Sequence, residues 1–288
     1  MVANTTGHSS TAMGYRALCT NSTGCYNTAL GRESLEENTT ACYNVAVGYH
    51  SLRCNQTGGA NTSIGVGSLS ANTASNNTAV GRSALVANTT GTNNAAVGCG
   101  ALAANTTASN NTALGVGALA VNTTGTFNTG IGRQALDANT EGNNNTAVGL
   151  GALTANTTAS NSVAVGCGAL ADNTIGDQNT AVGGTALGDN TEGEYNVAVG
   201  YNALRKNTTA DNNAAFGYYA LACNTTGNSN TAVGTCALSD NIDGAGNTAI
   251  GRLALANNTT ADYNVAIGYD SLFVNTEGHS NTAVGFNT

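Results

Sequence analysis

Apolar, small and amide side chains recur along this chain at a fixed interval of 17 residues. Gly stands at 14, 31, 48 and 65, and then at 81 and every 17th position as far as 285. The step between Gly65 and Gly81 is one residue short, and the missing residue falls in an arch near Asn72. The seventeen units have the form N-T-A-V-G-x-x-A-L-x-x-N-T-T-G-x-x and fill the chain. Internal repetition at a fixed period is typical of solenoid proteins.

Each unit predicts one coil of a β-solenoid with two short strands. A helix pair with its turn needs about 33 residues, so the shorter unit favours strands joined by two tight arches. The first expected strand is N-T-A-V-G, and the second is A-L-x-x-N-T. Because side chains alternate between the faces of a strand, we expect large apolar residues such as Val47 to point inward and small ones such as Ala46 to point outward. The recurrent Gly is expected where the coil turns with positive φ or where backbones approach closely.

The sequence therefore predicts an all-β fold, a parallel β-solenoid (β-roll) of about 17 coils that occupies residues 1–288 as a single array. At ~4.8 Å per coil, the array would form a rod about 80 Å long. No capping segment is recognised at either end, so both ends are expected to be open sheet edges. We expect the array to be part of a longer fibre, or a subunit whose ends stack on other copies.

The interior is expected to hold a ladder of Leu side chains, because a Leu follows four residues after the Gly of every complete unit. Burying one Leu and one Val stabilises a unit by roughly 3–6 kcal/mol. Ordering the backbone of its 17 residues costs about 17–34 kcal/mol in conformational entropy. Coils must therefore stack on one another to be stable. The core Leu ladder comprises Leu18, Leu35, Leu52, Leu69, Leu85, Leu102, Leu119, Leu136, Leu153, Leu170, Leu187, Leu204, Leu221, Leu238, Leu255 and Leu272.

A column of Asn, seven residues after each Gly, is equally uniform. Stacked identical amides bond to one another in cross-β assemblies, and a buried Asn without such partners would cost a few kcal/mol. The column therefore predicts a structural Asn ladder. Its members are Asn21, Asn38, Asn55, Asn72, Asn88, Asn105, Asn122, Asn139, Asn156, Asn173, Asn190, Asn207, Asn224, Asn241, Asn258 and Asn275.

Composition narrows the classes of function. Charged residues make up 8% of the chain, and 8 Lys and Arg stand against 16 acidic residues, which argues against nucleic-acid binding. No apolar run approaches ~18 residues, so no membrane insertion is expected. The common catalytic motifs and the calcium-binding G-G-x-G-x-D repeat do not occur. We therefore expect no enzyme, no catalytic residues, no metal and no cofactor.

Two kinds of covalent modification are suggested by side chains in the repeat. Cys25 and Cys42 share a column in adjacent coils, so their Cα atoms should lie ~4.8 Å apart. That separation allows a disulfide, but parallel Cβ directions would strain it, so a disulfide and two free thiols both stay open. The N-x-[ST] triplets outside the inward Asn column give the candidate glycan carriers Asn61, Asn76, Asn110, Asn144 and Asn257.

Several units resemble the head repeats of trimeric autotransporter adhesins, which read N-[ST]-V-A-[IV]-G. The similar segments are Asn44-Val45-Ala46-Val47-Gly48, Ser162-Val163-Ala164-Val165-Gly166, Asn196-Val197-Ala198-Val199-Gly200 and Asn264-Val265-Ala266-Ile267-Gly268. The longer N-T-A-V-G…A-L…N-T-T-G unit is similar to repeats of phage tail-fibre and related large surface proteins. The resemblance implies a parallel β-roll that trimerises and contacts a host surface.

These features favour a structural protein without catalysis, the shaft or adhesive head of an extracellular fibre on a cell or virion surface. Its expected partners are other copies of itself, in an end-to-end filament or a lateral trimer, and a host surface or glycans. The alternative is a ligand-binding β-roll. Thr ladders in the Asn-Thr-Thr arches would suit ice, and surface aromatic residues such as Tyr49 and Tyr201 would suit glycans.

Overall fold

The computed structural model describes residues 2–288 and shows an all-β parallel solenoid with a repeat of 17 residues. Every strand has three residues and lies within the predicted N-T-A-V-G strand of its repeat, without the first and last residues of that segment. The strands are β1 (Thr11–Met13), β2 (Thr28–Leu30), β3 (Val45–Val47), β4 (Thr62–Ile64), β5 (Thr78–Val80), β6 (Ala95–Val97), β7 (Thr112–Leu114), β8 (Thr129–Ile131), β9 (Thr146–Val148), β10 (Val163–Val165), β11 (Thr180–Val182), β12 (Val197–Val199), β13 (Ala214–Phe216), β14 (Thr231–Val233), β15 (Thr248–Ile250), β16 (Val265–Ile267) and β17 (Thr282–Val284).

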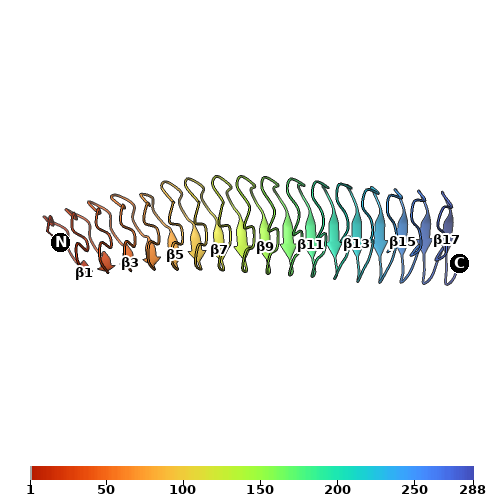
Figure 1. The fold of residues 1–288 in the computed structure, drawn as a ribbon, viewed down its shortest axis with the longest axis horizontal. Coiled ribbons are helices and arrows are strands. Elements are labelled where there is room, and N and C mark those ends of the chain that lie inside the picture. The colour runs from red at the N-terminus through yellow and green to blue at the C-terminus, as the bar shows by residue number, and fades with distance from the viewer. Residues whose placement is uncertain (1) are drawn as a thin grey trace. The chain divides into compact units, whose positions relative to one another are not determined.

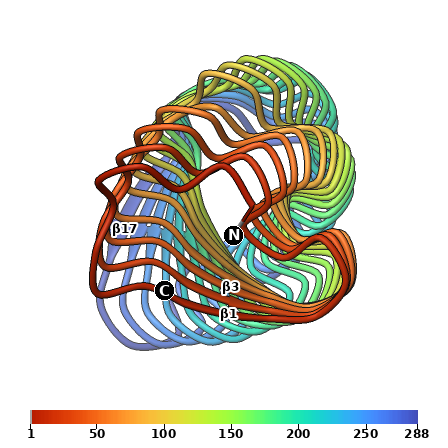
Figure 2. The same ribbon diagram turned by 90° about the vertical axis from the view of Figure 1, so that its left-hand side faces the viewer.

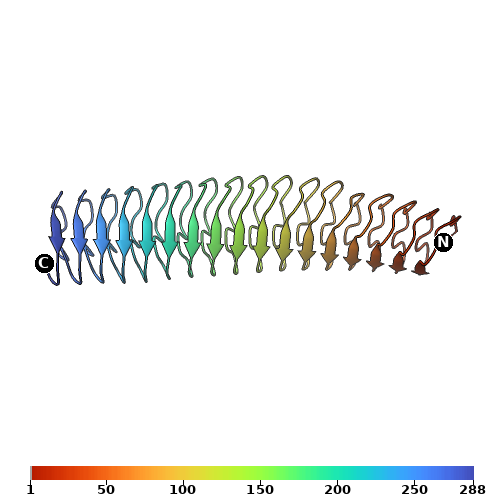
Figure 3. The same cartoon turned by 180° about the vertical axis from the view of Figure 1, so that it is seen from behind.

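The chain divides into two compact units, Met1–Asn144 with β1 to β8 and Asn145–Thr288 with β9 to β17. Within each unit, consecutive strands lie side by side in chain order (Figures 1 and 3). They pair in parallel and in strict register, so Ala96 of β6 lies opposite Ala79 of β5 and Ala113 of β7. The short step in the sequence leaves this register intact, because Ile64 of β4 still lies opposite Val80 of β5. The missing residue therefore shortens an arch and not the sheet.

The prediction of a second strand is wrong, because the A-L-x-x-N segment forms two successive tight turns. In a typical coil, the Ala101 N–H donates to the Gly98 carbonyl at 3.4 Å and the Asn105 N–H donates to the Leu102 carbonyl at 3.2 Å. The column Leu residues have φ between 47° and 54°, a left-handed conformation that cannot continue an extended strand. Figure 2 shows the first unit end-on, with β1 and β3 along one side of the coil and turns forming the remainder.

The recurrent Gly adopts positive φ, between 129° and 144°, in every 17-residue repeat. Close approach of backbones applies as well: a Cβ built on Gly98 would lie 2.3 Å from the carbonyl oxygen of Gly115 in the next coil. Both expected reasons for Gly at this position are therefore confirmed.

The predicted orientation of the strand side chains is also wrong. Ala96 and Ala113 are at most 1% exposed, whereas the neighbouring Val97 and Leu114 are 38% and 46% exposed. The column Leu side chains explain the reversal, since they fill the interior behind the strand. A Cβ built on Gly130, which stands in the Ala column, would lie 3.4 Å from Cδ1 of Leu119. The remaining space accepts a methyl group, so the larger side chain of each strand faces outward.

The core Leu ladder is confirmed. Every column Leu from Leu18 to Leu255 is 0% exposed, and Leu272 is partly buried. Where Ser63 replaces the buried Ala of its strand, its hydroxyl lies 2.8 Å from Oγ of Ser51 and 2.6 Å from Oγ of Ser68. The polar substitution inside the core is therefore matched by hydroxyl partners in its own and the preceding coil, as a buried hydroxyl requires.

Candidate functional site

The predicted Asn column forms a buried amide ladder. Nδ2 of Asn105 donates to Oδ1 of Asn88 at 2.8 Å, and Oδ1 of Asn105 accepts from Nδ2 of Asn122 at 3.0 Å. The second hydrogen of the Asn105 amide bonds to the Ala108 carbonyl at 3.0 Å, inside the same coil. Each amide thus links its coil to both neighbours and also closes its own arch. We call this set, the residues seven after each Gly, the arch Asn ladder.

The one-residue deletion interrupts the arch Asn ladder of the first unit. Nδ2 of Asn72 bonds to the Ala74 carbonyl at 2.7 Å, in the shortened arch. Oδ1 of Asn55 is buried and has no hydrogen-bond partner among the described residues. The ladder continues on the C-terminal side of the deletion, where Nδ2 of Asn88 donates to Oδ1 of Asn72 at 2.7 Å. The shortened arch therefore leaves a single buried acceptor unpaired.

A second Asn ladder, which sequence reasoning missed, lies at the start of each strand. In a typical member, Oδ1 of Asn196 accepts from the Asn213 backbone N–H at 3.0 Å and Nδ2 donates to the Ala210 carbonyl at 2.8 Å. The sequence carries a sign of this ladder, because Asn or Ser stands four residues before the recurrent Gly of every 17-residue repeat. This strand Asn ladder comprises Ser10, Asn27, Asn44, Asn61, Asn77, Asn94, Asn111, Asn128, Asn145, Ser162, Asn179, Asn196, Asn213, Asn230, Asn247, Asn264 and Asn281.

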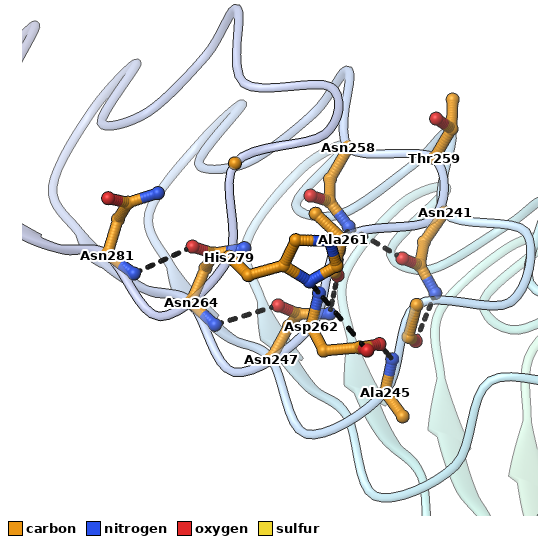
Figure 4. A network of polar contacts seen from close by, with 12 residues as sticks. Asn241, Ala245, Asn247, Asn258, Thr259, Ala261, Asp262, Asn264, His279 and Asn281 are labelled. Atoms are coloured by element: carbon orange, nitrogen blue, oxygen red, sulfur yellow. Dashed lines mark hydrogen bonds and ion pairs between the residues drawn. The ribbon is translucent and has the colours of Figure 1, made fainter.

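Polar arch side chains also bond to backbone groups of the neighbouring coil, as Figure 4 shows beside the two ladders. Oδ1 of Asp262 accepts from the Ala245 N–H at 2.7 Å. Nδ1 of His279 accepts from the Asp262 N–H at 2.8 Å. These titratable side chains are therefore engaged in satisfying the backbone of the arches, which is a structural task.

The structure separates the candidate glycan carriers. Asn61 is 0% exposed and belongs to the strand Asn ladder, where it donates to Oδ1 of Asn44 and to the Ala74 carbonyl. A glycan cannot be attached to a fully buried amide, so the prediction for Asn61 is wrong. Asn76, Asn110 and Asn144 are exposed and Asn257 is partly exposed, which leaves them as candidates.

Cys25 and Cys42 are free thiols, as are the other six Cys, so the disulfide alternative is wrong and the free-thiol alternative holds. Sγ of Cys42 lies 3.0 Å from the Cys25 backbone N and accepts its hydrogen. The thiol therefore has the same bonding role as Oδ1 of Asp262 in the equivalent position of a later coil.

Most of the cationic side chains with ionic partners lie in the first coils, where two carboxylates hold them. Glu36, only 3% exposed, accepts from Arg16 at 2.6 Å and from Arg53 at 3.0 Å. Glu33 contacts Nε of Arg32 at 3.0 Å and Nε2 of His50 at 2.5 Å. The hydrogen bond from His50, together with Arg32, holds the pKa of the Glu33 carboxyl below its ordinary value.

We expect acid to remove the contribution of Glu33 to stability. Because the folded pKa is depressed, this contribution is present above the ordinary carboxyl pKa and is lost as pH falls through the folded value. The melting temperatures of the wild-type chain and Glu33→Gln should differ near pH 7 and converge as pH falls below the ordinary carboxyl pKa and through the folded value. Glu192→Gln, which removes an exposed arch carboxylate, is the control for charge. A constant difference between wild type and Glu33→Gln across this range would contradict the assignment.

Surface aromatic residues pair with one another between coils. The rings of Tyr26 and Tyr43 stack with centroids 5.1 Å apart. The Arg32 guanidinium lies 5.6 Å from the Tyr15 ring centroid and 5.7 Å from that of Tyr49. These faces are partly covered by their neighbours, so they favour structural stacking over an open sugar platform.

Within residues 2–288, no group of three or more His, Cys, Asp or Glu side chains is arranged to hold a metal ion. The same residues include no helix of the length and apolarity that crossing a membrane requires. Comparison with models of known protein families gives no match, and no curated protein matches the chain closely enough to count as a relative.

Proposed function

We propose that the chain is a structural, non-enzymatic segment of an extracellular fibre, the shaft or head of an assembly on a cell or virion surface. The observation that carries this proposal is the continuity of bonding between coils. Adjacent coils share backbone hydrogen bonds, the arch Asn ladder and the strand Asn ladder, as at Asn105 and Asn196. Such repeated nearest-neighbour bonding suits a load-bearing spacer.

The resemblance to trimeric autotransporter adhesins and phage tail-fibre proteins supports the same proposal and supplies the partners. These are other copies of the chain, arranged end to end or as a lateral trimer, and a host surface or its glycans. Electron microscopy of the purified chain, with mass from light scattering, tests the assembly. Unbranched filaments or particles of three times the chain mass would support a fibre, whereas monomers at every concentration would contradict it.

We expect the folded chain to resist trypsin for times on the order of hours. Four of its seven Arg precede a residue in left-handed conformation, as at Arg82, where Ser83 has φ 57°. The Arg82 carbonyl also accepts the Gly100 N–H at 3.0 Å, so cleavage requires local unfolding of a coil.

The measurement is a time course of native digestion followed by mass spectrometry. Heat-unfolded chain should be cut rapidly at the same Arg, which shows that the sites are cleavable. Loss of the intact native chain within minutes would contradict a mechanically stable spacer.

A further inference from the structure

The outward side of the strands is a regular, uncharged surface that the structural role does not require. In each strand, the first and third side chains point outward, and the second is buried in β2 to β16 and partly buried in the terminal strands β1 and β17. We call these outward residues of one unit its outer strand face. No residue of any of the strands is charged. By contrast, the position just after each Gly, which is also on the surface, holds residues as different as Arg82, Cys99 and Tyr218.

The outer strand face consists of two columns in each unit. The first-position column holds Thr, Val or Ala, and the third-position column holds mainly Val, Ile and Leu. In the second unit, the first-position column contains Thr146, Val163, Thr180, Val197, Ala214, Thr231, Thr248, Val265 and Thr282. Exposure in the third-position column of the second unit is 36% at Ile267, 37% at Val165 and 42% at Phe216, lower at Val148 and Val199, and 66% at Val284 of the last strand. The columns are therefore similar in composition from strand to strand and follow the strict register of the sheet.

Two sets of Thr hydroxyls behave differently. In the arches, Oγ1 of Thr208 donates to the Thr225 carbonyl at 3.2 Å, and its copies make the same bond from coil to coil. These arch hydroxyls are used inside the protein, so the arch is not the outward hydroxyl array that ice binding would need. The strand hydroxyls, such as those of Thr231 and Thr248, make no side-chain hydrogen bond to any described residue. They are therefore available to water, between methyl groups that offer water no bond.

The spacing of this surface matches a lattice of hydrogen-bonded water. In-register parallel strands repeat about every 4.8 Å, and alternate residues along a strand lie about 6.7 Å apart. Water oxygens bonded tetrahedrally at about 2.75 Å have next-nearest neighbours about 4.5 Å apart and repeat along the hexagonal axis at about 7.3 Å. Both dimensions agree to within about a tenth. Charged side chains would orient water away from this lattice, and the face has none.

We propose that the outer strand face of each unit binds ice. The ligand is solid water, held by the free Thr hydroxyls and by the ordered water that surrounds the Val, Ile and Thr methyl groups. This function is separate from the proposed fibre role and needs no partner protein. A fibre that carried this face would attach to ice along its strands.

The test measures thermal hysteresis and inhibition of ice recrystallisation by the purified chain. The wild-type chain should show both activities. Thr231→Tyr places a bulky ring in the middle of the face of the second unit and should abolish the contribution of that unit. A double variant that adds Thr112→Tyr in the first unit should lose the activity altogether. Thr226→Tyr is the matched control, because Thr226 is exposed in an arch of the coil just before β14 and should leave the activity unchanged.

Circular dichroism and melting temperature verify that each variant is folded. Absence of both activities in the folded wild-type chain would overturn the proposal. Equal activity of the double variant and Thr226→Tyr would overturn it as well, because the strand face would then not be the site. If light scattering shows an oligomer that Thr231→Tyr dissociates, while no ice activity is present, the face is an interface with a second copy and not an ice-binding surface. Filament formation in electron microscopy is a separate readout, so failure here leaves the fibre proposal to its own test.

Discussion

Gly98→Ala should destabilise the first unit by roughly 3 kcal/mol or more, while Gly100→Ala, two residues away, should cost only about 1 kcal/mol. The methyl group added at Gly98 would lie 2.3 Å from the Gly115 carbonyl oxygen and would force an L residue to φ 140°. Gly100 has φ 67°, and no neighbouring atom lies within 4 Å of the position that an added methyl group would take. Only the left-handed conformation is penalised there, and Ser83 and Asn202 already adopt it in the same column.

Amide exchange of β6 and urea unfolding of both variants measure this difference. Exchange is needed because long repeat arrays can lose all-or-none unfolding. Similar losses for Gly98→Ala and Gly100→Ala would show that close backbone approach between coils does not limit this column.

Asn105→Ala should cost about 2–4 kcal/mol, because it leaves buried amide groups unpaired in both adjacent coils. Oδ1 of Asn88 would lose its donor and Nδ2 of Asn122 would lose one acceptor. Asn55→Ala is the matched comparison, since Nδ2 of Asn55 bonds to Oδ1 of Asn38 and to the Gly58 carbonyl but its Oδ1 has no partner. We expect Asn55→Ala to cost about 1 kcal/mol less than Asn105→Ala.

Denaturant unfolding of the wild-type chain and of the two variants measures the difference in the free energy of unfolding. Asn110→Ala, which truncates an exposed Asn in the same coil as Asn105, controls for loss of an amide outside the ladder. Equal losses for Asn55→Ala and Asn105→Ala would mean that the bond from the next coil contributes nothing to stability.

The repeat, the Leu ladder and the arch Asn ladder were predictable because each depends on period and chemical uniformity alone. The direction of the strand side chains was not, because Ala96 and Val97 are both apolar and alternation alone does not say which one is buried. That choice is made by Leu119 and its copies, whose left-handed backbone brings the Leu side chain behind the strand. Sequence patterns carry no direct sign of a Leu with positive φ, since this conformation is uncommon for residues other than Gly, Asn and Asp.

The strand Asn ladder was missed for a different reason. Its Asn residues begin the predicted strand, and the N-x-[ST] triplet at Asn61 predicts a glycan carrier. In the structure, Asn61 directly precedes β4 and is fully buried. Uniformity between repeats is the more reliable guide, because only Ser10 and Ser162 replace Asn in this column. Each hydroxyl accepts the backbone N–H of the next coil, from Asn27 at 3.1 Å and from Asn179 at 3.2 Å.

The bonding between coils has a consequence for how this protein folds and how its length can change. The contacts between adjacent coils join residues that are about one repeat apart: 17 residues separate Asn88 from Asn105 and Ala79 from Ala96, and 18 separate Gly31 from Met13. The sequence separation of such contacts stays the same however many coils a unit contains. Folding can therefore nucleate in any few coils and propagate to the neighbouring coils. The entropic cost of ordering each added coil does not grow with chain length. Gene segments that encode whole coils can then be duplicated or lost without a new folding problem, which makes length the most readily adjusted property of the molecule.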